Sequence, residues 1–427
     1  MKKSLEEIAA YYIERFGFDF EHLESIPDKR TKMIIVIPVY NEPTVTETLD
    51  SLSNCARPSG PVEVILVVNN SGEAQNSVQE QNLKAIADIN SWIEKNPNRP
   101  INCHLMSAMN LPPKHAGVGL ARKIGMDEAL RRFASLNYNG LIVCLDADCA
   151  VQPNYLMELD MNFAKEDFRA GNIYYEHPFN GEESKETRSG IIQYELGLRY
   201  YVNALRYAGY PCAFHTIGSS MAVSAKTYAL AGGMNKRKAG EDFYFLHKLI
   251  PHGGFQELNA TTVYPSSRVS ERVPFGTGRA MLKWEEQIAI NQNSDMQTYN
   301  LKTFRDLKKF IASIPKFASY TGERQYAEGT GQLPESIQAF LQEQDFYSVL
   351  LESIKQTAGE NTFSKRIFTW LDGFRVLKFV HFARDRYYSN VPVEKCVLNL
   401  LNQLDIAVPR NGPIDLLATM RKLDRGN

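Results

Sequence analysis

The sequence predicts an α/β protein: a mostly parallel sheet with helices on both faces, followed by a helical C-terminal region. Uninterrupted apolar runs indicate buried strands, and apolar residues between those runs recur at helical spacing. Strands that alternate with helices in this way are typical of parallel sheets. After about residue 292 the strand pattern fades and only helical spacing remains. The length of 427 residues indicates two to three domains.

The elements are expected in the following order. Residues 1–30 should contain a short amphipathic helix, because Leu5, Ile8, Tyr12 and Ile13 share one face. The sheet domain is predicted over residues 31–295, with strands at 33–37, 62–68, 101–106, 141–145 and 173–176 and helices at 45–52, 79–94 and 118–133. Residues 296–427 are predicted to form the helical domain.

Composition excludes several classes of protein. Lys and Arg number 48 and Asp and Glu number 49, so a general nucleic-acid binder is not indicated. No apolar run approaches the roughly 18 residues of a membrane span, and the first residues lack the apolar stretch of a signal peptide. Six cysteines without a Cys-x-x-Cys pair argue against disulfide frameworks and zinc sites. We therefore expect a cytoplasmic protein. A peripheral membrane contact through the basic aromatic segment 366–388 is less favoured than a helix docked by its apolar face.

Asp146 and Asp148 directly follow the apolar run at 141–145. Two carboxylates one residue apart, at the carboxyl end of a parallel strand, face the crevice where open α/β sheets bind ligands. Cations that bridge a diphosphate are held by one or two carboxylates together with phosphate oxygens. The pair therefore indicates a site for Mg²⁺ or Mn²⁺. The alternative is that the two acids only end a strand and begin a turn.

Polar and aromatic residues also follow the first two predicted strands. Tyr40 stands where a nucleobase could stack, although Glu42 and Pro43 also make a good helix start. Asn69 offers an amide donor and an acceptor to the edge of a base, or simply begins a turn.

Two further motifs precede predicted helices. The run 117–122 resembles the start of a dinucleotide fingerprint, but Arg122 occupies the place of the third glycine, so a nicotinamide or flavin site is rejected. We expect this helix to carry Arg122 toward a phosphate. Glu241 and Asp242 follow a basic, glycine-containing loop at 236–240. Acids at a helix start also stabilise its dipole by roughly 0.3–1 kcal/mol, which is the alternative role for this pair.

Together, in this order over about residues 33–290, these motifs resemble those of the family 2 glycosyltransferases, which have the Rossmann-like nucleotide-sugar fold called GT-A. The matching segments are 38–42, 69–71, 119–122, 146–148, 218–223, 232–233 and 240–242. The resemblance implies a metal at Asp146 and Asp148, and Asp242 as the general base with Glu241 beside it. It also implies a donor pocket formed by Pro38, Tyr40, Glu42, Asn69, Arg122 and Asp146.

The resemblance further implies an inverting, hexosyl-type transfer from a nucleoside-diphosphate sugar to a hydroxyl acceptor, a glycan or lipid-linked glycan, as in cell-surface polysaccharide biosynthesis. Asn69 stands where many members carry Asp, so a uridine donor is favoured and a guanosine donor stays open. Segment 263–266 lacks the metal-binding His of some members. The Gln-x-x-Arg-Trp signature of processive members is absent, so we expect one sugar per encounter.

Two alternatives to a glycosyltransferase remain. A nucleotidyltransferase of sugar phosphates would need a Gly-rich loop after the first strand, where this chain has Asn41, Glu42 and Pro43. A degenerate, non-catalytic transferase-like binding protein would be favoured by loss of Asp148 or Asp242, and both are present.

Overall fold

The chain divides into two compact units in the computed structural model, which describes residues 3–97, 99–165, 167–179, 184–270, 276–290, 295–408 and 412–426. Unit 1 comprises Met1–Thr187 and Thr216–Glu285, and unit 2 comprises Arg188–His215 and Glu286–Asn427. Residues 188–215 lie inside the predicted sheet domain of 31–295 but cluster with the later helices. Hydrophobic periodicity could not reveal this division, because it reports which face of an element is buried and not against what.

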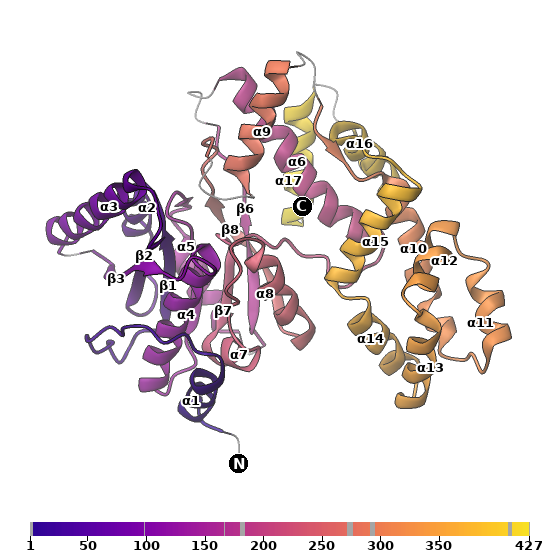
Figure 1. The fold of residues 1–427 in the computed structure, drawn as a ribbon, viewed down its shortest axis with the longest axis horizontal. Coiled ribbons are helices and arrows are strands. Elements are labelled where there is room, and N and C mark those ends of the chain that lie inside the picture. The colour runs from indigo at the N-terminus through magenta and orange to yellow at the C-terminus, as the bar shows by residue number, and fades with distance from the viewer. Residues whose placement is uncertain are drawn as a thin grey trace. The chain divides into compact units, whose positions relative to one another are not determined.

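Unit 1 is built on a mixed sheet with the strand order β3-β2-β1-β4-β7-β6-β8-β5. Figure 1 labels β1, β2, β3, β6, β7 and β8 of this sheet. The strands are β1 (Met33–Val39), β2 (Val62–Ser71), β3 (Ile101–Leu111), β4 (Leu141–Cys144), β5 (Ala150–Val151), β6 (Ala170–Tyr175), β7 (Met221–Ser224) and β8 (Phe255–Tyr264). The α/β class is confirmed, and the predicted strands correspond to β1, β2, β3, β4 and β6. The sheet is mixed rather than mostly parallel, because β7 runs antiparallel to β4 and β6, and β5 antiparallel to β8.

The strand directions determine which loops meet at one edge of the sheet. β1 is parallel to β2 and to β4, and β6 is parallel to β8. Since β7 is antiparallel to both β4 and β6, those two strands also run the same way. The carboxyl ends of β1, β2, β4, β6 and β8 therefore share one edge, which we call the carboxyl edge.

The helices of unit 1 are α1 (Leu5–Phe16), α2 (Val45–Ser53), α3 (Asn76–Lys95), α4 (Val118–Ser135), α5 (Tyr155–Phe163), α7 (Ala225–Leu230) and α8 (Glu241–Leu249) with the short 3-10 turn Ile250–His252, and α9 (Thr277–Ile290) begins in this unit. The predicted helical stretches correspond to α1, α2, α3, α4 and α8, and unit 1 has further helices that were not predicted. The amphipathic α1 packs against α4 and α7. Its buried face contains Leu5, Ala9 and Tyr12, whereas Ile13, expected on that face, is 37% exposed.

A network of buried polar groups fixes α1 to α4. The hydroxyl of Tyr12 donates to Asp127 over 2.7 Å, and the ammonium of Lys123 donates to Tyr12 over 2.7 Å. Lys123 also pairs with Asp127 at 3.0 Å. Because buried polar groups are costly unless they are hydrogen-bonded, this network makes α1 part of the core of unit 1.

Gly125 lets α4 lie close to the sheet. A Cβ at this position would overlap Cγ1 of Val36 in β1 and lie 3.1 Å from Cγ2 of Val67 in β2. We expect Gly125→Ala to lower the free energy of unfolding by about 1–3 kcal/mol, since extra atoms in a packed core force side chains and backbone to move. Urea denaturation measures this change.

The matched control is Gly197→Ala in the long helix α6 (Lys185–Tyr207), where a Cβ would meet only Cγ2 of Val393 at 3.8 Å. Alanine is the better helix former, so this control should be neutral or slightly stabilising. An equal loss of stability in both variants would contradict the packing explanation for Gly125.

Unit 2 is helical, as predicted for the C-terminal region. Its elements are most of α6, then α10 (Leu301–Phe317), α11 (Glu323–Thr330), α12 (Glu335–Glu343), α13 (Phe346–Gln356), α14 (Glu360–Trp370), α15 (Gly373–Arg386), α16 (Val393–Gln403) and α17 (Pro413–Arg425), with the short pair β9 (Gln297–Thr298) and β10 (Val391–Pro392). Val376, Phe379 and Val380 of α15 are at most 1% exposed, so this helix packs by its apolar face. Within the described residues, every helix is too short or too polar to cross a membrane.

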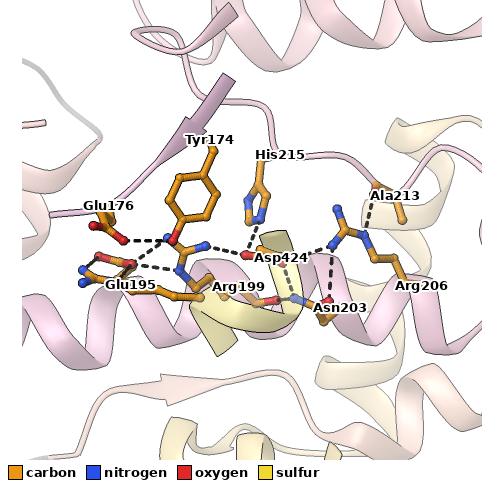
Figure 2. A network of polar contacts seen from close by, with 10 residues as sticks. Tyr174, Glu176, Glu195, Arg199, Asn203, Arg206, Ala213, His215 and Asp424 are labelled. Atoms are coloured by element: carbon orange, nitrogen blue, oxygen red, sulfur yellow. Dashed lines mark hydrogen bonds and ion pairs between the residues drawn. The ribbon is translucent and has the colours of Figure 1, made fainter. Parts of the chain in front are cut away.

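A buried carboxylate of α17 joins that helix to α6 (Figure 2). Asp424 accepts hydrogen bonds from Arg199 at 2.5 Å and Asn203 at 2.7 Å, and pairs with Arg206 at 3.1 Å and His215 at 3.0 Å. Burial opposes the charge on Asp424, but His215 and Arg199 hold its pKa well below the ordinary value. This network, called the Asp424 network below, lies entirely within unit 2.

Candidate active site

The carboxyl edge brings together the residues that the sequence singled out after separate strands. Tyr40 and Glu42 follow β1, Asn69 lies near the end of β2, and Asp146 and Asp148 follow β4. These three strands are neighbours in the order β2-β1-β4. In α/β sheets, such an edge is the usual place for a ligand.

Arg122 of α4 is a buried cation that links two carboxylates from distant parts of the chain. Its side chain is 3% exposed. Nη2 donates to Oδ1 of Asp146 over 2.5 Å, and Nη1 pairs with Glu241 at the start of α8. Arg122 therefore joins the end of β4 to the start of α8. Since both terminal nitrogens are engaged by carboxylates, Arg122 positions Asp146 and Glu241 in this structure.

Glu241 and Asp242 stand in different environments although they are adjacent. Glu241 is 3% exposed, and burial raises its pKa to about 7 while Arg122 acts in the opposite direction. Asp242 is half-buried and accepts a hydrogen bond from the amide of Phe243 over 2.8 Å. Burial also raises the pKa of Asp242 above its ordinary value, again opposed by Arg122. Glu241 is held in an ion pair, so Asp242 is the better candidate for proton transfer.

Two glycines explain the motif at the start of α4. A Cβ on Gly117 would lie 3.1 Å from Cα of Lys238, and a Cβ on Gly119 would overlap the carbonyl oxygen of Arg237. Because Gly117 and Gly119 have no side chains, the loop at 236–240 can pack closely against α4. That loop leads into Glu241 and Asp242, so the glycines position the acids of α8.

Glu42 forms an ion pair with Arg268, a residue that the sequence did not single out. Glu42 is 1% exposed, and Oε1 accepts from the amide and the hydroxyl of Thr44, each over 2.9 Å. Oε2 pairs with Arg268 at 2.7 Å. Arg268 follows β8, so it also lies at the carboxyl edge, and its side chain is 36% exposed. The sequence offered no signal for this pair, because its members are 226 residues apart.

Two buried asparagines, Asn69 and Asn82, link the ends of β1 and β2 by hydrogen bonds. Asn82 of α3, which is fully buried, donates to the carbonyl oxygen of Asn69 over 3.0 Å and accepts from the amide of Asn41 over 2.8 Å. Asn69 in turn donates its side-chain amide to the carbonyl of Val39 over 3.0 Å. Asn41 has the left-handed φ of 49° that Asn tolerates. The backbone on both sides of Tyr40, at Val39 and at Asn41, is therefore fixed by hydrogen bonds.

The predicted nucleoside residues differ in how much surface they present. Pro38 is buried inside β1, and Glu42 and Asn69 are each 1% exposed. Tyr40 is half-buried and thus presents part of its ring at the edge. Asn82, which the sequence did not single out, belongs to the same arrangement through its bond to Asn41.

Asp146 and Asp148 fit a metal ion that is bound partly by the protein and partly by the ligand. The described part of the chain contains no group of three or more His, Cys, Asp or Glu side chains arranged to hold a metal ion. Mg²⁺ usually keeps several waters and takes one or two carboxylates together with substrate phosphates. Asp148 is half-buried, and Asp146 is already paired with Arg122. The residues fit a metal shared between Asp148 and a diphosphate better than a site made of protein alone.

Comparisons with known proteins give low similarity. No protein-family model matches the chain, and no curated protein matches it. The structure of S. aureus TarS 1–349 in complex with UDP-GlcNAc is similar with a TM-score of 0.40 and 14% identity, covering 81% of this chain and 91% of that chain. The UDP complex of TarS 1–349 gives a TM-score of 0.38 and 15% identity over the same shares. A further S. aureus TarS structure gives 0.35 and 13%, covering 79% of this chain and 54% of that one.

Proposed function

We propose that the protein is a glycosyltransferase of the GT-A type, similar to family 2, that moves one sugar from a nucleoside-diphosphate donor to a hydroxyl acceptor. The observation that carries the proposal is the placement of Asp146 and Asp148 at the carboxyl edge, joined through Arg122 to the acids that open α8. Such a transfer needs charge compensation for a diphosphate on one side and a base for the acceptor on the other. This arrangement provides candidates for both.

In the proposed reaction, the bond between the anomeric carbon and the acceptor oxygen forms as the bond to the diphosphate breaks. Asp242 takes the proton of the acceptor hydroxyl from the side opposite the leaving group, which inverts the anomeric centre. A bound Mg²⁺ or Mn²⁺, held by Asp148, would stabilise the negative charge on the diphosphate. Arg268, held by Glu42, can donate N–H groups to the same charge.

The start of α2 argues against a nucleotidyltransferase. That class needs a Gly-rich loop after the first strand to surround a triphosphate with backbone amides. Here the segment after β1 contains Glu42, whose carboxylate is 1% exposed, followed by Pro43, which has no amide hydrogen to donate.

A thermal-shift panel tests the proposed donor class. We expect UDP and UDP-sugars with Mn²⁺ to stabilise the protein most, and GDP less. A ligand at about 100 times its Kd adds roughly 2.7 kcal/mol to the free energy of unfolding. If GDP stabilised more than UDP, the base preference would be reversed. If no nucleotide stabilised the protein, the proposed function itself would fail.

Asp148→Ala tests the proposed metal contact. We expect the variant to lose Mn²⁺-dependent binding of UDP, because the carboxylate that would share the cation with the diphosphate is gone. Calorimetry with and without Mn²⁺ measures the effect. The control is Asp160→Ala in α5, whose carboxylate accepts from the amide of Ser59 over 2.7 Å, just before β2 and away from the carboxyl edge. Equal metal-dependent affinity in wild type and Asp148→Ala would refute the assignment.

A further inference from the structure

Helix α10 has one buried apolar face and one exposed basic face. Phe304, Leu307, Phe310 and Ile314 are each at most 1% exposed and face the interior of unit 2. The exposed cations of the helix are Lys302, Arg305, Lys308, Lys309 and Lys316, called the basic stripe below. At 3.6 residues per turn they fall within a sector of about 120° and extend over about 21 Å of helix.

No acid of α10 balances these charges. Its single acidic residue, Asp306, is 7% exposed and accepts hydrogen bonds from Ser336 at 2.6 Å and Tyr388 at 2.7 Å. In the part of the chain that the structure describes, members of the basic stripe make no ion pair. The whole protein has a net charge of −1, so the stripe is a local excess of positive charge.

Two members of the stripe lie over aromatic rings of unit 2. Lys308 is 3.9 Å from the ring centroid of Tyr207, and Lys302 is 5.9 Å from that of Tyr388. The other three, Arg305, Lys309 and Lys316, have no such contact in the described residues. Like charges three and four residues apart destabilise a helix, so a stripe of this kind is unfavourable for the isolated fold. An anionic partner would remove that cost.

We propose that the basic stripe is a docking surface for a membrane that contains anionic phospholipids. Clusters of four to eight Lys and Arg on an amphipathic helix suit anionic lipid headgroups. Because the five cations lie on one exposed side of α10, they can face a flat surface together. Single-stranded nucleic acids instead bind in charged grooves lined with stacking aromatic rings. The inference rests on α10 alone and does not depend on the proposed sugar transfer.

Co-sedimentation of the full chain with lipid vesicles tests the proposal. The variant Arg305→Gln, Lys309→Gln, Lys316→Gln removes the three cations without ring contacts and keeps residues with good helix propensity. We expect wild type to bind vesicles of phosphatidylglycerol and phosphatidylcholine and to remain in solution with phosphatidylcholine alone. Each cation near an anionic surface contributes about a fivefold factor, so the triple variant should bind on the order of 100-fold more weakly.

The control variant carries the same change in net charge at scattered exposed lysines, Lys29→Gln, Lys84→Gln and Lys365→Gln. Binding by this control close to wild type, and loss of wild-type binding at high salt, would support the stripe. Equal losses in the two triple variants would overturn it, because net charge alone would then explain binding. Wild-type binding to single-stranded DNA but not to anionic vesicles would also overturn it.

Discussion

Replacing Asp242 by Asn is expected to slow sugar transfer by on the order of 10²-fold or more while folding and donor binding stay close to wild type. The side-chain oxygen of Asn is a hydrogen-bond acceptor like that of Asp, so the bond from the amide of Phe243 can be kept. A neutral amide accepts no proton at neutral pH, so the proposed base is lost. Steady-state kinetics, the Kd for UDP and the melting temperature separate these effects.

The stereochemistry of the product gives an independent measurement of the same assignment. Attack from the side of Asp242, opposite the leaving diphosphate, should give an anomeric configuration opposite to that of the donor. NMR of the wild-type product reads this configuration directly. Full activity in Asp242→Asn, or retention of configuration, would return Asp242 to a purely structural role at the start of α8.

Removing the carboxylate of Asp424 is expected to produce the largest loss of stability. In Asp424→Ala, Arg199, which is fully buried, loses a partner at 2.5 Å and keeps only Glu195, at 2.7 Å. Breaking a buried ion pair from one side typically costs about 3–5 kcal/mol, so we expect a loss toward the lower end of this range. Urea denaturation followed by circular dichroism measures the loss. The control is Asp385→Asn, since this exposed acid pairs with its neighbour Arg384 and surface pairs contribute little.

The pH dependence of the Asp424 network has a definite sign. The folded protein holds the pKa of Asp424 below the ordinary value, so its contribution is fully present above that value, about 3.9, and is lost only as the pH falls further. The difference in stability between wild type and Asp424→Ala should thus be at least as large at pH 5 as at pH 7. A difference that disappeared by pH 5 would contradict the lowered pKa.

Four of the five predicted strands, β1, β2, β4 and β6, are buried along almost their whole length, whereas the fifth, β3, is only partly buried. All seven residues of β1 are buried, and β4 is buried throughout, so each reads as a continuous apolar run. β8 is only partly buried and contains Gln256 and Glu257, while β5 has two residues, so neither gives such a run. β7 is buried, but its apolar run is only Met221, Ala222 and Val223. The sheet is mixed because β7 and β5 run antiparallel to their neighbours. The apolar pattern therefore identified five strands that run in the same direction and missed β8 and the antiparallel β5 and β7.

The sequence predicted those candidate site residues that directly follow a continuous apolar run. It did not predict residues whose position depends on a partner far away in the sequence. Asp146 and Asp148 were visible because β4 directly precedes them. Arg268 pairs with Glu42, 226 residues away. Arg199 of α6 pairs with Asp424, 225 residues away, as well as with Glu195 of its own helix. Local spacing contains no information about such distant pairs.

The separation of Arg199 and Asp424 also has a consequence during synthesis. At about 5–20 residues per second, a ribosome adds the 225 residues between them in roughly 10–45 s. Throughout that interval Arg199 of the nascent α6 has Glu195, one helical turn before it, as a neighbouring acid but does not yet have Asp424. Residues 188–215 moreover interrupt unit 1, whose strands β7 and β8 emerge only afterwards. Unit 2 can therefore complete the Asp424 network only after the last residues of the chain have been synthesised.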